Sequence, residues 1–264
     1  AARWYNNGKH DLGRQTMGKI IAVANQKGGV GKSTMLVALA SLLNYTMDKS
    51  VAIVDCDATQ RSLFNLRERD KEMVERNKRY MTLLEEQRLR GCKIYPIKRV
   101  KPEDARAAAG EFAKTGEYDI IFIDLPGSMD VPGVLQTIFN VDYVLTPIAA
   151  DNFVMDSSFS FASSVVRFLA EKKGIPLKDI YMFWTKIKRR SNVEVLKNYS
   201  ELMEKTGLKV LKSSIPELCR YEKELSMSSR TYFRCSLLPP PAGQLKGSGL
   251  QELANELLEI LKLK

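Results

Sequence analysis

The stretch Lys19-Ile20-Ile21-Ala22-Val23-Ala24-Asn25-Gln26-Lys27-Gly28-Gly29-Val30-Gly31-Lys32-Ser33-Thr34 changes character twice. Its first part, Lys19 to Asn25, is a short apolar run that is typical of a buried strand. A glycine-rich turn follows, and then an uncharged segment from Ser33 to Met47 that we expect to be helical. The order strand, glycine-rich loop and helix is therefore the starting point for the fold.

Strands and helices continue to alternate along the rest of the chain. Further strands are expected at 51–55, 118–125, 141–146 and 180–185, and helices near 102–115, 153–173, 191–206 and 248–262. This alternation predicts right-handed strand–helix–strand crossovers and an α/β fold, with a mostly parallel sheet and helices on both faces.

The chain shows no linker, repeat or low-complexity tract that would divide it. We expect one domain over residues 17–264, preceded by a polar, flexible N-terminal arm at 1–16, with Met17 as a candidate natural start. Residues 61–91 are highly charged and helix-prone, with seven arginines, and are interpreted as an elaboration on the surface of that domain.

Composition excludes several classes of site. The four cysteines are scattered without a Cys-x-x-Cys pair, and the single histidine, His10, precedes the first apolar run. Zinc sites, disulfide frameworks and histidine triads are therefore not expected.

No stretch reaches about 18 consecutive apolar residues, so a cytoplasmic protein is predicted. The net charge of +10 favours a polyanionic partner, although a merely solvated basic surface explains it equally well.

The glycine-rich turn has the chemistry of a phosphate cradle. Gly28, Gly29 and Gly31 leave backbone N–H groups unobstructed, and the following helix presents its positive end. Lys32 can neutralise β- and γ-phosphate charge, and the Ser33 hydroxyl can bind Mg²⁺. A glycine-rich turn that binds nothing is the alternative, but so long a match between a strand and a helix makes it remote.

The loop departs from the ordinary G-x-x-x-x-G-K-[ST] pattern, because Gln26 replaces its first glycine and Lys27 is gained. In this form, Asn25 to Thr34 resembles the deviant Walker A motif of the ParA/MinD family of P-loop ATPases. Val54-Asp55-Cys56-Asp57, Ile123-Asp124-Leu125-Pro126-Gly127 and Ser214-Ile215-Pro216-Glu217 extend the resemblance over most of residues 17–264. Thr146 to Asp151 and Leu237 to Pro240 are similar to ParA-like TraA proteins of conjugative transposons.

The resemblance implies an ATP-sandwiched homodimer with a single P-loop NTPase domain in each subunit. Lys27 would then be the signature lysine that reaches the partner's nucleotide, whereas a solvated lysine beside a turn is the alternative. Residues 27–34, including Val30 and Thr34, would hold ATP, with Thr34 at the α-phosphate. The Gly127 amide would sense the γ-phosphate, and Pro216 is a candidate for the adenine contact.

Three aspartates at predicted strand ends complete the expected site. The resemblance implies that Asp57 orients the attacking water and that Asp124 holds Mg²⁺ through water, with support from Asp55. Carboxylates at strand carboxyl ends face the crevice where α/β sheets bind ligands. The alternative for each is a helix N-cap. The family's usual proline after the second aspartate is Ala58 here, which predicts a looser loop and slower or more partner-dependent hydrolysis.

Basic residues in the C-terminal third are the candidates for nucleic-acid contacts, since ParA-like dimers bind DNA without sequence preference through such surfaces. The candidates are Lys186, Lys188, Arg189, Arg190, Lys212, Arg220, Arg230 and Arg234. A solvated face is the alternative for each. The amphipathic stretch 249–262 carries three glutamates, so we expect it to pack on the domain rather than bind a membrane.

The sequence thus predicts a nucleoid-associated switch in which Mg·ATP closes a homodimer on non-specific DNA and a ParB-like partner stimulates hydrolysis. Its predicted duty is partition or maintenance of a plasmid or conjugative element. A MinD-like positioning ATPase that acts on a membrane or protein cargo is the alternative. An electron-delivering reductase is disfavoured by the unpaired cysteines, and a metabolic P-loop enzyme by the absence of an evident acceptor site.

Overall fold

The computed structural model describes residues 18–26, 29–57, 63–149, 152–171, 174–188, 193–228 and 231–263. The predicted arm, residues 1–16, lies outside these ranges. The described residues contain a seven-stranded sheet in the order β3-β2-β4-β1-β5-β6-β7. Its strands are β1 (Lys19–Val23), β2 (Val51–Asp55), β3 (Ile97–Arg99), β4 (Ile120–Asp124), β5 (Tyr143–Ala149), β6 (Asp179–Ile187) and β7 (Lys209–Pro216).

Every strand pairing among the described residues is parallel. The predicted α/β class is therefore confirmed, with a fully parallel sheet in place of a mostly parallel one. Strands β3 and β7 are absent from the sequence prediction. Both lie at the sheet edges and carry lysine or arginine among few apolar residues, so neither shows the continuous apolar run of a central strand.

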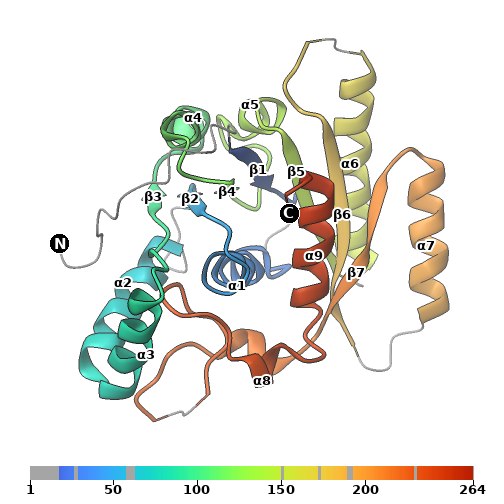
Figure 1. The fold of residues 1–264 in the computed structure, drawn as a ribbon. Helices are drawn as coiled ribbons and strands as arrows, with labels where there is room; N and C mark the ends of the chain where they lie inside the picture. Colours follow the sequence, from blue (N-terminus) through green and yellow to red (C-terminus); the bar gives the residue numbers. More distant parts are fainter. Residues whose placement is uncertain are drawn as a thin grey trace.

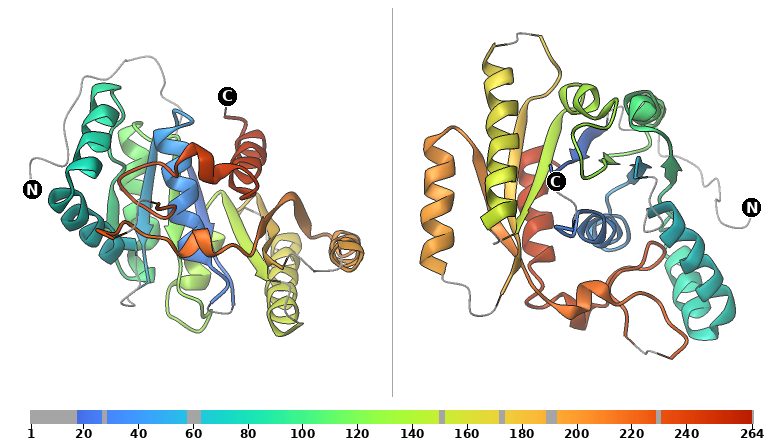
Figure 2. Two further views of the ribbon diagram at one scale, coloured as in Figure 1. Left: turned by 90° about the horizontal axis from the view of Figure 1, so that it is seen from below. Right: turned by 180° about the vertical axis from the view of Figure 1, so that it is seen from behind.

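Helices cover both faces of the sheet, as Figures 1 and 2 show. The helices are α1 (Lys32–Tyr45), α2 (Leu63–Arg76), α3 (Lys78–Leu89), α4 (Ala105–Thr115), α5 (Val134–Phe139), α6 (Asn152–Glu171), α7 (Val193–Lys205), α8 (Ala242–Leu245) and α9 (Leu250–Leu261). Two 3-10 turns, η1 (Pro102–Asp104) and η2 (Cys219–Glu222), complete the described elements.

The alternation of side chains along each strand divides the core into two layers. In β4, Ile120 and Phe122 face the layer that contains α1 and α9, whereas Ile121 and Ile123 face the layer that contains α4 to α7. Helix α1 is buried along almost its whole length, which explains why it has no charged residue after Lys32. Burial of these faces on both sides is the main force that fixes the register of the central strands.

The C-terminal helix α9 packs on the domain, as the sequence predicted. Leu250, Leu253, Leu257 and Leu261 are buried in the layer next to α1. The Glu256 carboxylate accepts hydrogen bonds from the amides of edge strand β7. The apolar face of α9 is therefore already covered. None of the helices in the described ranges is long and apolar enough to cross a membrane.

Helices α2 and α3 are more deeply integrated than a surface elaboration, so that interpretation of residues 61–91 is wrong in part. A third apolar cluster joins them to the segment at 223–241, which runs between η2 and α8. We call this the 223–241 segment. Arg67, only 1% exposed, donates to the Ser236 hydroxyl over 2.8 Å and to the Ser236 and Tyr95 carbonyls. The charge pattern alone does not reveal a buried arginine, because most arginines on such helices are solvated.

Asp70 completes this buried polar cluster by accepting hydrogen bonds from the amide and hydroxyl of Ser236, each over 2.7 Å. Burial raises the pKa of the Asp70 carboxyl to about 6, against the opposing effects of those bonds and of Arg67. The folded protein therefore keeps a proton between about pH 4 and pH 6 that the unfolded chain releases. The contribution of this carboxyl to stability must fall as pH rises through that window.

Replacement of Asp70 by asparagine is expected to remove this pH dependence, because an amide does not titrate. As pH falls from 7 to 4, the wild type should become more stable relative to Asp70→Asn. The difference between their free energies of unfolding should increase by about 2–3 kcal/mol at most. Urea unfolding at pH 4, 5, 6 and 7 measures the difference. A difference that stays constant over this range would show that Asp70 has an ordinary pKa.

Candidate functional site

The candidate site lies at the carboxyl edge of the sheet, where β1 leads into α1. Strand β1 lies between β4 and β5, so the chain order reverses on its two sides. Such a switch point is where parallel α/β sheets leave a crevice for ligands. Gly29 and Gly31 have φ values of 82° and 85°, a region that side chains with a Cβ rarely adopt. The loop conformation therefore depends on glycine at both positions.

The N-terminus of α1 is suited to bind an anion. Its N-cap, Gly31, provides no side-chain hydrogen bond, and the first turn contains no acidic residue. The free N–H groups and the positive end of the helix dipole thus remain available for a negatively charged group. Val30, which precedes the cap, is buried at 2% exposure and anchors the loop in the core.

Neighbouring strands hold the loop by its carbonyl groups and by Asn25. The buried Asn25 donates to the Pro147 carbonyl over 2.5 Å and accepts from the Ser158 hydroxyl. On the other side, the Thr185 hydroxyl donates to the Val30 carbonyl over 3.3 Å. These supports come from β5, α6 and β6. Sequence reasoning missed them because nothing in their local pattern relates them to a loop more than 100 residues away.

Lys186 also contacts the loop. Its ammonium donates to the Gly29 carbonyl over 2.6 Å, and its backbone has a φ of 53°, unusual for a residue with a side chain. Its charge is thus directed toward the glycine-rich loop, while the residue remains exposed. The predicted role of Lys186 in DNA binding stays a prediction.

Lys32, Ser33 and Asp124 form the centre of the site. The Lys32 ammonium lies 2.8 Å from Asp124 Oδ1, in an ion pair whose side chains are 8% and 0% exposed. The Ser33 hydroxyl donates to Asp124 Oδ2 over 2.6 Å. The structure therefore brings together three residues that the sequence predicts to act on one nucleotide and its metal, although two of them are 91 and 92 residues from the third.

Asp55 and Asp124 end adjacent parallel strands and are paired in register. The Asp55 carboxylate is buried and accepts from the amides of Asp57 and Phe64, over 3.2 and 2.9 Å. The bond to Phe64 holds the start of α2, as the helix-capping alternative expects. The metal-supporting role of Asp55 stays a prediction. Asp57 is partly exposed just beyond β2. Its role in orienting water stays a prediction.

Cys56, between the two aspartates, is protected from ionisation. Burial, followed by the negative charges of Asp55 and Asp124, raises the pKa of its thiol to about 12. The group is therefore a neutral thiol at physiological pH. It has no nucleophilic character there.

Several predicted residues lie outside the described ranges, namely Lys27, Gly28, Arg189, Arg190 and Arg230. Of the others, Gly127 lies three residues after Asp124, at the same sheet edge as the glycine-rich loop. Pro216 ends β7 and pairs with Ile187 at the end of β6. Their nucleotide contacts stay predictions.

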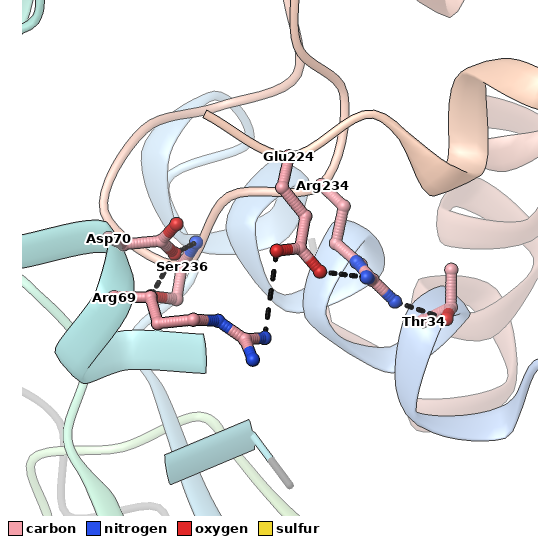
Figure 3. A network of polar contacts seen from close by, with 6 residues as sticks. All are labelled: Thr34, Arg69, Asp70, Glu224, Arg234 and Ser236. Atoms are coloured by element: carbon pink, nitrogen blue, oxygen red, sulfur yellow. Dashed lines mark hydrogen bonds and ion pairs between the residues drawn. The ribbon is translucent and has the colours of Figure 1, made fainter. Parts of the chain in front are cut away.

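The described DNA-binding candidates differ in their exposure and contacts. Lys188 and Lys212 are exposed, as such a role requires. Arg220 instead donates to the carbonyls of Gln244 and Lys246. Arg234 pairs with Glu224 and donates to the Thr34 hydroxyl over 2.7 Å, on the first turn of α1 (Figure 3). The guanidinium groups of Arg220 and Arg234 are thus engaged within the molecule, and their predicted role in DNA binding stays a prediction.

A parallel sheet with a glycine-rich loop between its first strand and a buried helix defines the P-loop class of nucleotide-binding folds. The model for the CobQ/CobB/MinD/ParA nucleotide binding domain matches residues 21–227. The chain belongs to this family, which confirms the predicted family assignment.

Two curated relatives are both named Soj. The chain is 27% identical over 170 residues to the sporulation initiation inhibitor protein Soj of Bacillus subtilis (strain 168), which covers 56% of this chain and 65% of that protein. It is 28% identical over 150 residues to the chromosome-partitioning ATPase Soj of Thermus thermophilus, and this alignment covers 52% of this chain and 57% of that protein. The alignments thus span less than two thirds of either relative.

Solved structures share the fold at lower identity. The MinC:MinD cell division protein complex of Aquifex aeolicus matches with a TM-score of 0.60 and 16% identity, over 92% of this chain and 96% of that one. Apo McdA of Cyanthece matches with a TM-score of 0.59 and 18% identity, over 90% and 99%. These likenesses show that the architecture is that of MinD- and ParA-type proteins.

Proposed function

We propose that this protein is an ATP-dependent switch that hydrolyses Mg·ATP and acts in DNA partition or in the maintenance of a plasmid or conjugative element. The observation that carries the proposal is the cluster of Lys32, Ser33 and Asp124 beside the uncapped N-terminus of α1. It provides amides for phosphate, a cation for developing charge, and a hydroxyl with a carboxylate for a divalent metal.

The residues present fit Mg²⁺ and ATP. Magnesium binds oxygen donors and usually keeps several waters, and Ser33 and Asp124 supply a hydroxyl and a carboxylate at one point. We assign the metal to these two residues, where it would neutralise phosphate charge. We assign the phosphates to the loop at residues 27–34. Lys32 would exchange its partner Asp124 for phosphate oxygens, so its contact with Asp124 holds the ammonium near its place of action.

Hydrolysis and dimerisation follow from the same proposal. Asp57, which is partly exposed just beyond β2, is our candidate for orienting the attacking water. Lys27 is our candidate for the cation that each subunit of a homodimer directs to its partner's nucleotide. A second lysine would stabilise charge that develops on the transferred phosphoryl group, as an arginine finger does in other P-loop proteins.

We propose non-specific DNA as the partner of the ATP-bound dimer and a ParB-like protein as the activator of hydrolysis. Support comes from the net charge of +10 and from the relatives named as chromosome-partitioning proteins. Lys188 and Lys212 are exposed candidates for phosphate contacts, and Arg189 and Arg190 are candidates from the sequence. Such a dimer would associate with the nucleoid.

A mobility-shift assay tests this function. With ATP and Mg²⁺ the protein should bind duplex DNA of unrelated sequences, and affinity should fall steeply as salt increases. ADP or the absence of nucleotide should give little binding. Nucleotide-independent or absent binding would contradict the proposal, and ATP-dependent sedimentation with liposomes would favour the MinD-like alternative.

Charge reversal identifies the DNA surface in the same assay. Arg189→Glu with Arg190→Glu should abolish ATP-dependent DNA binding and leave ATP binding intact. Lys78→Glu with Lys93→Glu is the matched control, because both lysines are exposed, lie outside the candidates, and change the net charge equally. Equal loss in the two double variants would show that only total charge matters.

A further inference from the structure

The polar network of Figure 3 joins the first turn of α1 to helix α2 through the 223–241 segment. Arg234 Nη1 donates to Thr34 Oγ1 over 2.7 Å, and Arg234 Nη2 pairs with Glu224. The other oxygen of Glu224 lies 3.6 Å from Arg69 on α2. One carboxylate is thus shared by two guanidinium groups, so Arg69, Glu224 and Arg234 together carry one net positive charge, and Arg234 lies beside the end of α1 that is expected to face phosphate.

The backbone of Arg234 is firmly held, although the end of its side chain is accessible. Its neighbours Phe233 and Cys235 are completely buried, and the Phe233 and Arg234 amides both donate to the Lys223 carbonyl. The Arg234 side chain is 24% exposed. A fixed backbone with a partly accessible guanidinium is the arrangement that preorganises a binding group.

The guanidinium also has unused donor capacity. Arg234 Nε is buried and has no hydrogen-bond partner among the described residues. Buried donors without partners are rare in folded proteins, and an incoming acceptor can relieve their cost. The Thr34 hydroxyl accepts from Arg234, so its own hydrogen remains available to an acceptor on the nucleotide side.

We propose that Arg234 is a nucleotide-binding residue that acts, directly and through Thr34, on a phosphate group that ATP and ADP share. This inference rests on the proposed nucleotide site at α1 and adds to it a cation from outside the glycine-rich loop. Glu224 neutralises part of the Arg234 charge and so opposes its pull on phosphate. Arg69, on the helix that follows Asp57 and its loop, competes with Arg234 for that carboxylate.

Two substitutions at the Arg234–Glu224 pair should act in opposite directions. Arg234→Ala should weaken binding of Mg·ATP and Mg·ADP by about the same factor, roughly 10- to 100-fold. Glu224→Gln keeps a hydrogen-bond acceptor and removes the competing charge, so it should strengthen binding of both nucleotides by about 2- to 10-fold. Titration with fluorescent N-methylanthraniloyl derivatives of ATP and ADP measures these constants without relying on turnover.

Arg220→Ala is the matched control, because Arg220 is also an arginine of the C-terminal third, and its guanidinium donates to the carbonyls of Gln244 and Lys246 rather than to a residue of α1. It should leave both affinities within twofold. Thermal unfolding without nucleotide should show that Arg234→Ala and Arg220→Ala remain folded. If Arg234→Ala does not remain folded, Arg234→Lys, which keeps the charge, should bind both nucleotides with intermediate affinity.

The outcomes separate this inference from the proposed function. Failure of the wild type to bind either nucleotide would overturn both. Wild-type binding with an unaffected Arg234→Ala, or a loss confined to ATP, would overturn the role of Arg234 alone. A loss of affinity in Glu224→Gln equal to that in Arg234→Ala would show that the pair only supports the 223–241 segment.

Discussion

Substitution of Lys27 by alanine is expected to abolish ATP-dependent dimerisation and to lower ATP turnover by about 10³-fold or more. The physical reason is that a cation contributed from the partner stabilises charge only in the closed dimer, where the site excludes water and electrostatic interactions are strong. The monomer should still bind ATP, because Lys32 and the α1 amides belong to the same subunit as the nucleotide.

Size-exclusion chromatography with light scattering, in Mg²⁺ with ATP or ADP, measures the first effect, and phosphate release measures the second. Lys49→Ala is the matched control, since Lys49 precedes β2 and so lies at the amino ends of the strands, opposite to the candidate site. It should dimerise and turn over ATP normally. Dimerisation and turnover by Lys27→Ala equal to those of the wild type would show that this lysine does not act across the dimer.

Substitution of Lys32 is expected to have its largest effect one step earlier, on nucleotide binding itself. Removal of the ammonium leaves the buried Asp124 carboxylate without its cation and directly facing the incoming phosphates. Loss of the attraction and the added repulsion should reduce ATP affinity by at least about 100-fold, roughly 3 kcal/mol. Affinity for ADP should fall as well, because the lysine is expected to contact the β-phosphate.

Lys32→Met tests this effect with the length of the side chain nearly preserved. Asp124→Asn in the same background restores electroneutrality, so the double variant should recover folding stability but not nucleotide affinity. Titration with a fluorescent ATP analogue gives the affinity, and urea unfolding gives the stability. An affinity within about threefold of the wild type in Lys32→Met would remove this lysine from the site.

The central part of the fold could be predicted because its residues carry strong local signals. The apolar runs that became β1, β2 and β4 are continuous, and α1 has no charged residue after Lys32 and is buried along almost its whole length. Edge strands β3 and β7 could not be predicted, since solvent on one side allows lysines and serines in place of apolar residues.

The candidate site was predictable where one short motif defines it, and less so where distant residues complete it. The spacing from Gly29 to Ser33 is itself the signal. By contrast, Lys186 and Arg234 were interpreted as DNA contacts, because a sequence shows their charge but not its direction. Arg67 was expected on the surface for the same reason. The packing of the 223–241 segment against α1 and α2 shows where Arg67 and Arg234 point, and the contact with the Gly29 carbonyl shows it for Lys186.

The central claim is that a triphosphate binds on the amides that precede and open α1, with a lysine from each subunit crossing to the other. A crystal structure with Mg²⁺ and a non-hydrolysable ATP analogue tests it most directly. We predict phosphates over Gly29 to Thr34, Lys32 transferred from Asp124 to phosphate oxygens, and Lys27 at the partner's nucleotide. An empty loop, or Lys27 directed into solvent within a closed dimer, would contradict the account.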